Sequence, residues 1–155
     1  MSKSLKRVRA ALEAAGETPD IRETALARTA QDAADALGCG VDQIAKSIIF
    51  RGTESNEALL FVTAGGNRVD ASKATALAGE PLDKADAALI RAQTGFAIGG
   101  VSPVGHLNPI RSFLDPRLMD FEVIWAAAGT PHHVFSIAPQ RLSALTGAEF
   151  VEFTE

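Results

Sequence analysis

The segment from Gly99 to His106 combines residue types that could present backbone groups to a ligand. Two adjacent glycines, Gly99 and Gly100, allow the main chain to approach a bound molecule closely. Pro103 stiffens the segment and removes one N–H donor. N–H groups fixed in this way can stabilise a carbonyl oxygen, an oxyanion or a phosphate. The same residues also fit a tight corner between two strands, and the residue pattern alone leaves both interpretations open.

Lys46 is the second position that could take part in chemistry. It stands at the start of the apolar stretch Ser47–Phe50, which is typical of a strand. Its ammonium group could reach an anionic partner along the sheet, or the side chain could extend to solvent. The sequence contains no nucleophile elbow, no Gly-Lys-Ser/Thr phosphate loop and no His-Glu-x-x-His. These common catalytic motifs therefore do not identify a reactive side chain.

The remaining cysteine and histidines do not indicate a metal centre. Cys39 is the single cysteine, which excludes an internal disulfide and a multi-cysteine zinc site, and we interpret it as a structural residue. His106, His132 and His133 are too few and too poorly spaced to predict a metal site. For His106 and His132 a structural role and a ligand-binding role both stay open. We expect no metal and no cofactor.

Composition and charge restrict the partners. The 155 residues carry a formal net charge of −4, which argues against binding long nucleic acid through a broad basic surface. Any nucleic-acid footprint should be small and local, and we expect no DNA partner. No secretory signal and no apolar run of roughly 18 residues is evident, so we expect a cytoplasmic protein with no membrane partner.

The elements that must position these residues follow from apolar periodicity and from start and stop residues. We predict a helix from Ser4 to Ala15, a helix capped by Thr29 and ending at Gly38, and an antiparallel hairpin of strands 46–51 and 58–64. A helical turn is expected at 41–45, helices at 70–77, 86–94 and 139–145, and short strands at 21–24, 109–114, 121–127, 133–137 and 150–151, with one more entering the loop at Phe96.

These elements predict an α+β fold in one domain over residues 1–155. The sheet should be mixed and largely antiparallel, or a partly open barrel, with flanking helices. Asp70 begins one helix, and a capping role explains it better than a catalytic one, although both are considered. Arg51, Arg68 and Lys73 could touch an anionic ligand, but charged side chains on a solvated face are the default.

Two stretches resemble the YbaK/EbsC-type family. The first runs from Thr29-Ala30 through Leu37-Gly38 to Gln43-Ile44-Ala45-Lys46-Ser47-Ile48-Ile49-Phe50. The second is Thr94-Gly95-Phe96 followed by Gly99-Gly100-Val101-Ser102-Pro103-Val104-Gly105. The lysine segment combined with a Gly-x-x-x-Pro loop at this distance is a specific pattern. The family includes the editing domain inserted in many bacterial prolyl-tRNA synthetases and its free-standing relatives.

The resemblance implies a mixed sheet or barrel with flanking helices, and hydrolysis of the ester that joins a wrong amino acid to the terminal adenosine of tRNA. It places the functional lysine at Lys46 and the loop at Gly99, Gly100 and Pro103. The loop backbone would hold the aminoacyl group, Lys46 would engage the adenosine end or its phosphate, and a substrate ribose hydroxyl would assist the attacking water. We assign Lys46, Gly99 and Gly100 as catalytic, and expect substrate contacts from Val101, Ser102, Pro103, Thr29, Asp70 and His132.

The expected substrate is tRNA(Pro) carrying a small wrong amino acid, recognised at its acceptor end. Prolyl-tRNA synthetase or an elongation factor could assist. Two other functions stay open at this point: a non-catalytic module that binds tRNA or a synthetase, and hydrolysis of a small ester unrelated to tRNA. The sequence does not identify the amino acid, because a methyl-sized difference in a pocket gives only about 1–3 kcal/mol of discrimination.

Overall fold

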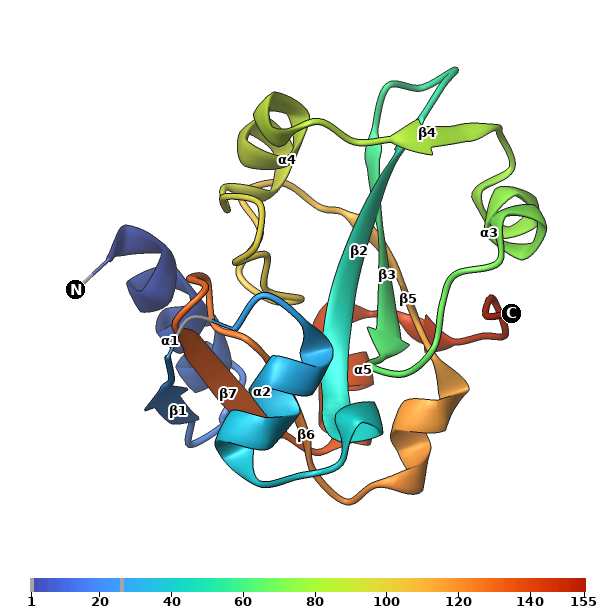
Figure 1. Cartoon of the computed structure of the whole chain (residues 1–155). Helices are drawn as coiled ribbons and strands as arrows, with labels where there is room; N and C mark the ends of the chain where they lie inside the picture. Colours follow the sequence, from blue (N-terminus) through green and yellow to red (C-terminus); the bar gives the residue numbers. More distant parts are fainter. Residues whose placement is uncertain (1, 26) are drawn as a thin grey trace.

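The computed structural model describes residues 2–25 and 27–155, and this part of the chain is built around one mixed sheet of eight strands. Figure 1 shows the long strand β2 crossing the middle of the molecule, with helices around it. The strands are β1 (Asp20–Glu23), β2 (Ile44–Gly52), β3 (Ala58–Ala64), β4 (Leu82–Lys84), β5 (Arg111–Leu114), β6 (Ile124–Ala127), β7 (His133–Ile137) and β8 (Glu149–Phe150). The helices are α1 (Lys3–Ala14), α2 (Ala30–Leu37), α3 (Ala71–Ala78), α4 (Ala87–Thr94) and α5 (Pro139–Thr146), with 3-10 turns η1 (Val41–Gln43) and η2 (Pro116–Asp120).

The strand order explains why the sheet is mixed. The order is β1-β7-β6-β2-β3-β5-β8, and β4 pairs with β2 outside this path. β2 and β3 form the predicted antiparallel hairpin, and β6 and β7 form a second one. β6 pairs with β2 in parallel, as β5 does with β3 and β8 with β5. The expected mixed, largely antiparallel sheet with flanking helices is therefore confirmed.

Both faces of the sheet are covered. The main core lies between one face and the helices α1, α4 and α5, with Val8, Phe96 and Leu142 fully buried in it. On the other face α3 packs over Phe61, and α2 packs over Ile44 and Trp125 near β6. Every residue of β3 is buried, because this central strand has helices above and below it.

The helix boundaries follow the capping residues in the sequence. The Thr29 hydroxyl accepts a hydrogen bond from the N–H of Asp32 at the start of α2, and Gly38 ends the helix with a φ of 70°. Asp70 accepts from the N–H of Lys73 at the start of α3. These caps satisfy N–H groups that have no partner within the helix. No helix in residues 2–25 and 27–155 is long and apolar enough to cross a membrane.

Three local features differ from the sequence expectation. No strand begins at Phe96; the whole stretch from there to Ile110 is loop, because its glycines and prolines do not fit a ladder. The short strand β4 follows Pro81 and was not predicted, since three residues carry too little periodicity to detect. The turn η2 was also missed, although Asp115 caps it and Pro116 occupies its first position.

Candidate functional site

The central strand β2 has an interrupted edge. Along one side it pairs with β3 over nearly its whole length. On its other side β6 pairs only with Ile44 and Ala45, and β4 only with Phe50–Gly52. On this second side, no strand in the described part of the chain pairs with Lys46–Ile49. A cavity of about 510 Å³ lies at this gap, within the usual range of about 300–1,000 Å³ for ligand sites.

The cavity wall comes from many parts of the chain because the gap opens toward both faces of the sheet. Ile49 belongs to the main core, Ile48 and Phe50 face α3, and Trp125 faces α2. The wall consists of Thr24, Ala27, Arg28, Thr29, Ala30, Ala33, Ile44–Phe50, Lys84, Ala85, Ile90, Ile98, Gly99, Val101, Trp125, Ala126, Ala127, Thr130, Pro131, His133 and Val134.

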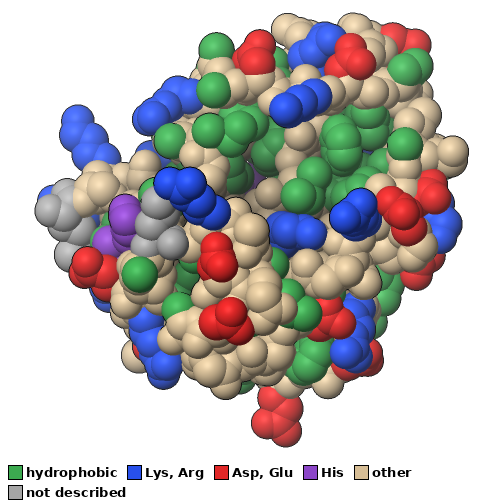
Figure 2. All heavy atoms as spheres, viewed as in Figure 1, with side chains coloured by type: hydrophobic (Ala, Val, Ile, Leu, Met, Phe, Trp, Pro, Cys, Tyr) green, Lys and Arg blue, Asp and Glu red, His purple; other side chains and the backbone are tan. Residues whose placement is uncertain are grey.

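The charge of the cavity differs from that of the whole protein. Arg28, Lys46 and Lys84 contribute to its wall, whereas none of the described wall residues is an aspartate or a glutamate. The chain as a whole has a formal net charge of −4. Figure 2 shows this face hollowed near its centre, with hydrophobic side chains lining the hollow and Lys and Arg side chains around it. The local potential therefore favours an anionic ligand with an apolar part.

Lys46 is held at the cavity by main-chain oxygens. Its Nζ donates hydrogen bonds to the carbonyl oxygens of Asn67 at 3.0 Å and Gly65 at 3.4 Å. These two residues form the turn that follows β3. Burial lowers the pKa of Lys46, and the nearby positive charge of Arg68 lowers it further. An ammonium group has three N–H donors, so the third can be given to a ligand.

A buried carboxylate supports the turn that holds Lys46. Asp115 is 2% exposed, and one of its oxygens accepts from the N–H of Ala64 at 3.0 Å and from the side-chain amide of Asn67 at 2.9 Å. Its other oxygen accepts from the N–H of Arg117 at 3.0 Å. The carboxylate thus ties the end of β3 and the turn at Asn67 to η2, and the carbonyl of Asn67 stays in reach of Lys46.

The glycine-rich loop contributes Ile98, Gly99 and Val101 to the cavity wall. Gly99 and Val101 line the cavity, and within residues 2–25 and 27–155 no acceptor is bonded to the N–H of either. Gly99 has a φ of 90°, with open space where a Cβ would lie. These two N–H groups are therefore available as donors at the cavity wall. An oxyanion site needs preorganised donors of this kind.

Gly100 has a different position from the one that its assignment as catalytic implies. Its N–H donates to the carbonyl of Ala97 at 3.0 Å, and it is not part of the cavity wall. A Cβ at Gly100 would come within 2.9 Å of the Cα of Thr130. Glycine is needed here because the loop packs directly against the backbone of the turn between β6 and β7.

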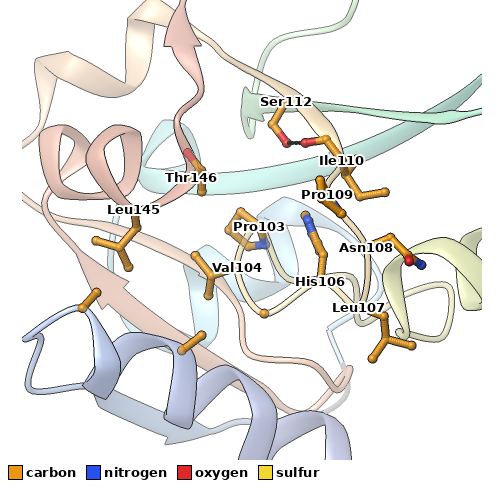
Figure 3. A pocket seen from close by; sticks show the side chains of 13 residues that line it. Pro103, Val104, His106, Leu107, Asn108, Pro109, Ile110, Ser112, Leu145 and Thr146 are labelled. Carbon is orange, nitrogen blue, oxygen red and sulfur yellow. Dashed lines mark hydrogen bonds between the residues drawn. The ribbon is translucent and has the colours of Figure 1, made fainter.

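Ser102 and Pro103 lie behind the loop. Ser102 is fully buried, and its hydroxyl accepts from the N–H of Val104 at 3.2 Å. Its carbonyl oxygen lies 2.7 Å from Nε2 of His106. Pro103 and His106 line a separate cavity of about 400 Å³ on this side, which Figure 3 shows between the loop, α1 and α5. The structure therefore places Ser102 and Pro103 where they shape the loop, away from the main cavity.

The three other sequence-assigned residues are not brought together. Thr29 lines the cavity and also caps α2. Asp70 caps α3 and is absent from the cavity wall. His132 is exposed and not part of the wall; its N–H donates to the hydroxyl of Thr130 at 3.1 Å.

The neighbouring histidine, His133, is in the wall and was missed. Its Nδ1 lies 2.7 Å from the Thr130 hydroxyl, and its Nε2 lies 3.8 Å from a carboxylate oxygen of Glu23. Trp125, also missed, stacks under the guanidinium of Arg22, whose Cζ is 4.7 Å from the ring centroid. The signal in the sequence was weak: His133 begins a strand, but the strand alone does not say which face meets a cavity.

Two further observations concern polar groups. The hydroxyl of Ser47, in the cavity wall, is buried and has no hydrogen-bond partner among the described residues. In the same part of the chain no group of three or more His, Cys, Asp or Glu side chains is placed to hold a metal ion. What the site offers on its own is a cationic side chain, free backbone donors and an apolar wall, a combination suited to binding and orienting a polar ester.

Comparison with known proteins agrees with this chemistry. The aminoacyl-tRNA editing domain family matches residues 24–145. The chain is 31% identical to the uncharacterised protein YwhH of Bacillus subtilis, over 90% of this chain and 89% of that one. It is 25% identical to EbsC of Enterococcus faecalis, a candidate Cys-tRNA(Pro)/Cys-tRNA(Cys) deacylase, over 81% of this chain and 77% of that one. A solved structure of a candidate trans-editing enzyme for prolyl-tRNA synthetase is 44% identical, with a TM-score of 0.92 over 100% of this chain and 99% of that one.

Proposed function

Because this chain belongs to the aminoacyl-tRNA editing domain family, with the YbaK/EbsC-type relatives described above, we propose that it hydrolyses the ester of mischarged tRNA. It would act in trans, on tRNA that a synthetase has already released. The proposed substrate is tRNA(Pro) carrying a small wrong amino acid, recognised at its acceptor end. Prolyl-tRNA synthetase or an elongation factor is a possible carrier of that tRNA.

One observation carries the proposal: among the described wall residues of an apolar cavity there are three cations and no carboxylate, in a protein of net charge −4. The acceptor end of tRNA combines a phosphate, a flat base and a small amino-acid side chain. The cationic rim suits the phosphate, and the apolar wall suits the base and the side chain. A protein that grips only this end needs no broad basic surface, in keeping with the overall negative charge.

The proposed mechanism uses positioning more than side-chain reactivity. Lys46 holds the adenosine end or its phosphate through the N–H that the carbonyls of Gly65 and Asn67 leave available. The N–H groups of Gly99 and Val101 point to the ester carbonyl and stabilise the negative charge that develops on its oxygen. Water, assisted by a ribose hydroxyl of the substrate, attacks the carbonyl carbon. The tetrahedral intermediate then expels the ribose oxygen that carried the ester. This oxygen takes up the proton that the attacking water has lost.

The test is single-turnover deacylation of tRNA(Pro) charged with alanine, cysteine, serine or 2-aminobutyrate. Wild type is compared with Lys46→Ala and with Lys73→Ala. Lys73 is a matched control, because its Nζ also donates to a backbone carbonyl, that of Thr154 at 2.8 Å, but it is outside the cavity wall. We expect one ester to be lost well above its spontaneous rate, with this loss abolished in Lys46→Ala and retained in Lys73→Ala.

Two other outcomes would redirect the assignment. If no mischarged tRNA is hydrolysed while tRNA still binds, the protein is a binding module with an editing-domain fold. If small amino-acid esters are hydrolysed as fast as the tRNA-linked ones, the tRNA part of the proposal is wrong.

A further inference from the structure

Arg7 of helix α1 contacts both ends of the glycine-rich loop. Its Nε donates to the carbonyl oxygen of Gly105 at 2.6 Å, and its Nη2 donates to the carbonyl oxygen of Gly95 at 2.9 Å. Between them the guanidinium stacks on Phe96, with Cζ 4.5 Å from the ring centroid. One side chain therefore joins two points of the main chain that are ten residues apart in sequence.

The loop needs such an anchor because no ladder holds it. Residues 95–105 contain neither helix nor strand, so only isolated contacts fix the backbone of Gly99 and Val101 at the cavity. One contact is the packing of Gly100 on Thr130, and another is the hydrogen bond between His106 and the carbonyl of Ser102. Just outside the two ends, the N–H groups of Leu107 and Asn108 donate to the carbonyl oxygens of Thr94 and Gln93, at 3.1 and 3.3 Å. Arg7 adds to this closure by binding Gly95 and Gly105 within the loop itself.

Glycine at position 95 fits the same arrangement. Gly95 has a φ of 82°, and a Cβ there would come within 2.6 Å of Nη2 of Arg7. A side chain would thus displace the guanidinium from the carbonyl that it binds. Gly105 likewise has a positive φ, of 79°, and its missing Cβ faces the backbone of Arg7 at 3.4 Å. Glycine at both ends of the loop therefore leaves room for Arg7 of α1 to pack closely.

The charge of Arg7 is not balanced by an acid. No carboxylate in residues 2–25 and 27–155 forms an ion pair with it. Burial correspondingly lowers the pKa of the guanidinium. Two carbonyl oxygens and a ring face are its described partners, and all three belong to the loop. The hydrogen bonds and the cation–π contact of this guanidinium therefore all join α1 to the loop.

We propose that Arg7 is a positioning residue for the reaction, which clamps the loop so that the N–H groups of Gly99 and Val101 face the cavity. The inference rests on the proposed deacylase function. It adds a residue outside the segment that matches the editing-domain family, since that match begins at residue 24.

The experiment uses the full chain with Arg7→Met, which keeps the apolar stem and removes the guanidinium, and Arg7→Lys, which can bind only one carbonyl well. Arg9→Met is the matched control, because Arg9 lies on the same helix and no hydrogen bond or ion pair joins its side chain to a described residue. Three quantities are measured: the single-turnover rate at saturating protein, the affinity for tRNA(Pro), and hydrogen exchange at the amides of Gly100 and Val104.

These two amides report on the loop because they are hydrogen-bonded within it, to Ala97 and to Ser102. In Arg7→Met we expect their exchange to rise at least tenfold, the rate to fall at least tenfold, and tRNA affinity to change less than twofold. Arg7→Lys should lie between, and Arg9→Met should match wild type. If Arg7 acts only through the packing of its apolar stem, which methionine keeps, Arg7→Met should have the wild-type rate.

The outcomes separate this inference from the proposed function. If wild type deacylates tRNA and Arg7→Met is within twofold of it, the positioning role is overturned while the function stands. If exchange at Gly100 and Val104 is unchanged, the clamp itself is overturned. If wild type has no deacylase activity, the proposed function and the role of Arg7 in that reaction both fail, and hydrogen exchange then reports only whether the contact orders the loop.

Discussion

Replacing Gly99 with alanine tests whether the loop conformation at the cavity matters for activity. Its φ of 90° is a conformation that costs an L-residue about 1–2 kcal/mol. Alanine also restricts the unfolded chain, which offsets about 0.4–1 kcal/mol of this cost. The net loss in the free energy of unfolding is therefore about 1 kcal/mol. Apart from its two chain neighbours, no described residue has an atom within 4 Å of the added Cβ, so we expect no steric clash to add to this loss.

A matched control exists at the end of α3. Gly79 has a φ of 78°, and a Cβ there would also have no atom within 4 Å, but Gly79 is not part of the cavity wall. Gly79→Ala should lower stability by the same amount, about 2–4 °C in melting temperature for a chain of this size. Only Gly99→Ala should also slow deacylation. If the substitution raises the free energy of the active loop conformation by about 1 kcal/mol, the rate should fall about fivefold.

The assay combines thermal melting with single-turnover deacylation of the preferred mischarged tRNA. Equal melting temperatures with unequal rates would support a requirement for the left-handed conformation at Gly99. If both variants keep the wild-type rate, or both lose it to the same extent, the reasoning that links this conformation to the reaction is refuted.

Three other substitutions test residues outside the wall of the main cavity. Asp115→Asn should lower the free energy of unfolding by about 2–3 kcal/mol, because hydrogen bonds to a buried charge are lost; a urea midpoint unchanged from wild type would contradict this. Burial lowers the pKa of His106, an effect that the charge of Arg7 reinforces and the hydrogen bond to Ser102 opposes. The unfolded chain therefore takes up this proton first, and stability should decline as the pH falls below about 6.5; His106→Gln should flatten that part of a pH series of urea midpoints. Burial raises the pKa of Cys39, so iodoacetamide at pH 8 should label the folded protein more slowly than the unfolded one, and Cys39→Ala should deacylate within twofold of wild type.

The sequence predicted most of the fold because the relevant signals are local. The hairpin of β2 and β3 follows from two apolar runs separated by a short polar turn, and β3 has the predicted bounds. The helices α2 and α3 begin at capping residues that the sequence displays openly. The parallel pairings of β2 with β6 and β3 with β5 could not be predicted in detail, because they join segments more than fifty residues apart.

The site was only partly predictable for the same reason. Lys46 and Gly99 stand out by residue type, and the structure places both in the wall of one cavity. That Gly100 packs inward and that His133, not His132, reaches the wall depends on tertiary packing. The role we infer for Arg7 depends on how α1 meets the loop, and an arginine on an amphipathic helix otherwise suggests only a solvated face.

The two outermost strands of the sheet have a consequence for recombinant work on this family. β1 and β8 end the main strand order, and both lie outside residues 24–145, the part that matches the editing-domain family. A fragment cut at those boundaries would bare the backbone of β7 and β5 and uncover the core that Val8 and Phe153 now fill. Unpaired edges of this kind associate with one another. Such a fragment should therefore aggregate. In the full chain, β1 covers the edge of β7 and carries the charged residues Asp20, Arg22 and Glu23, which disfavour association with another strand.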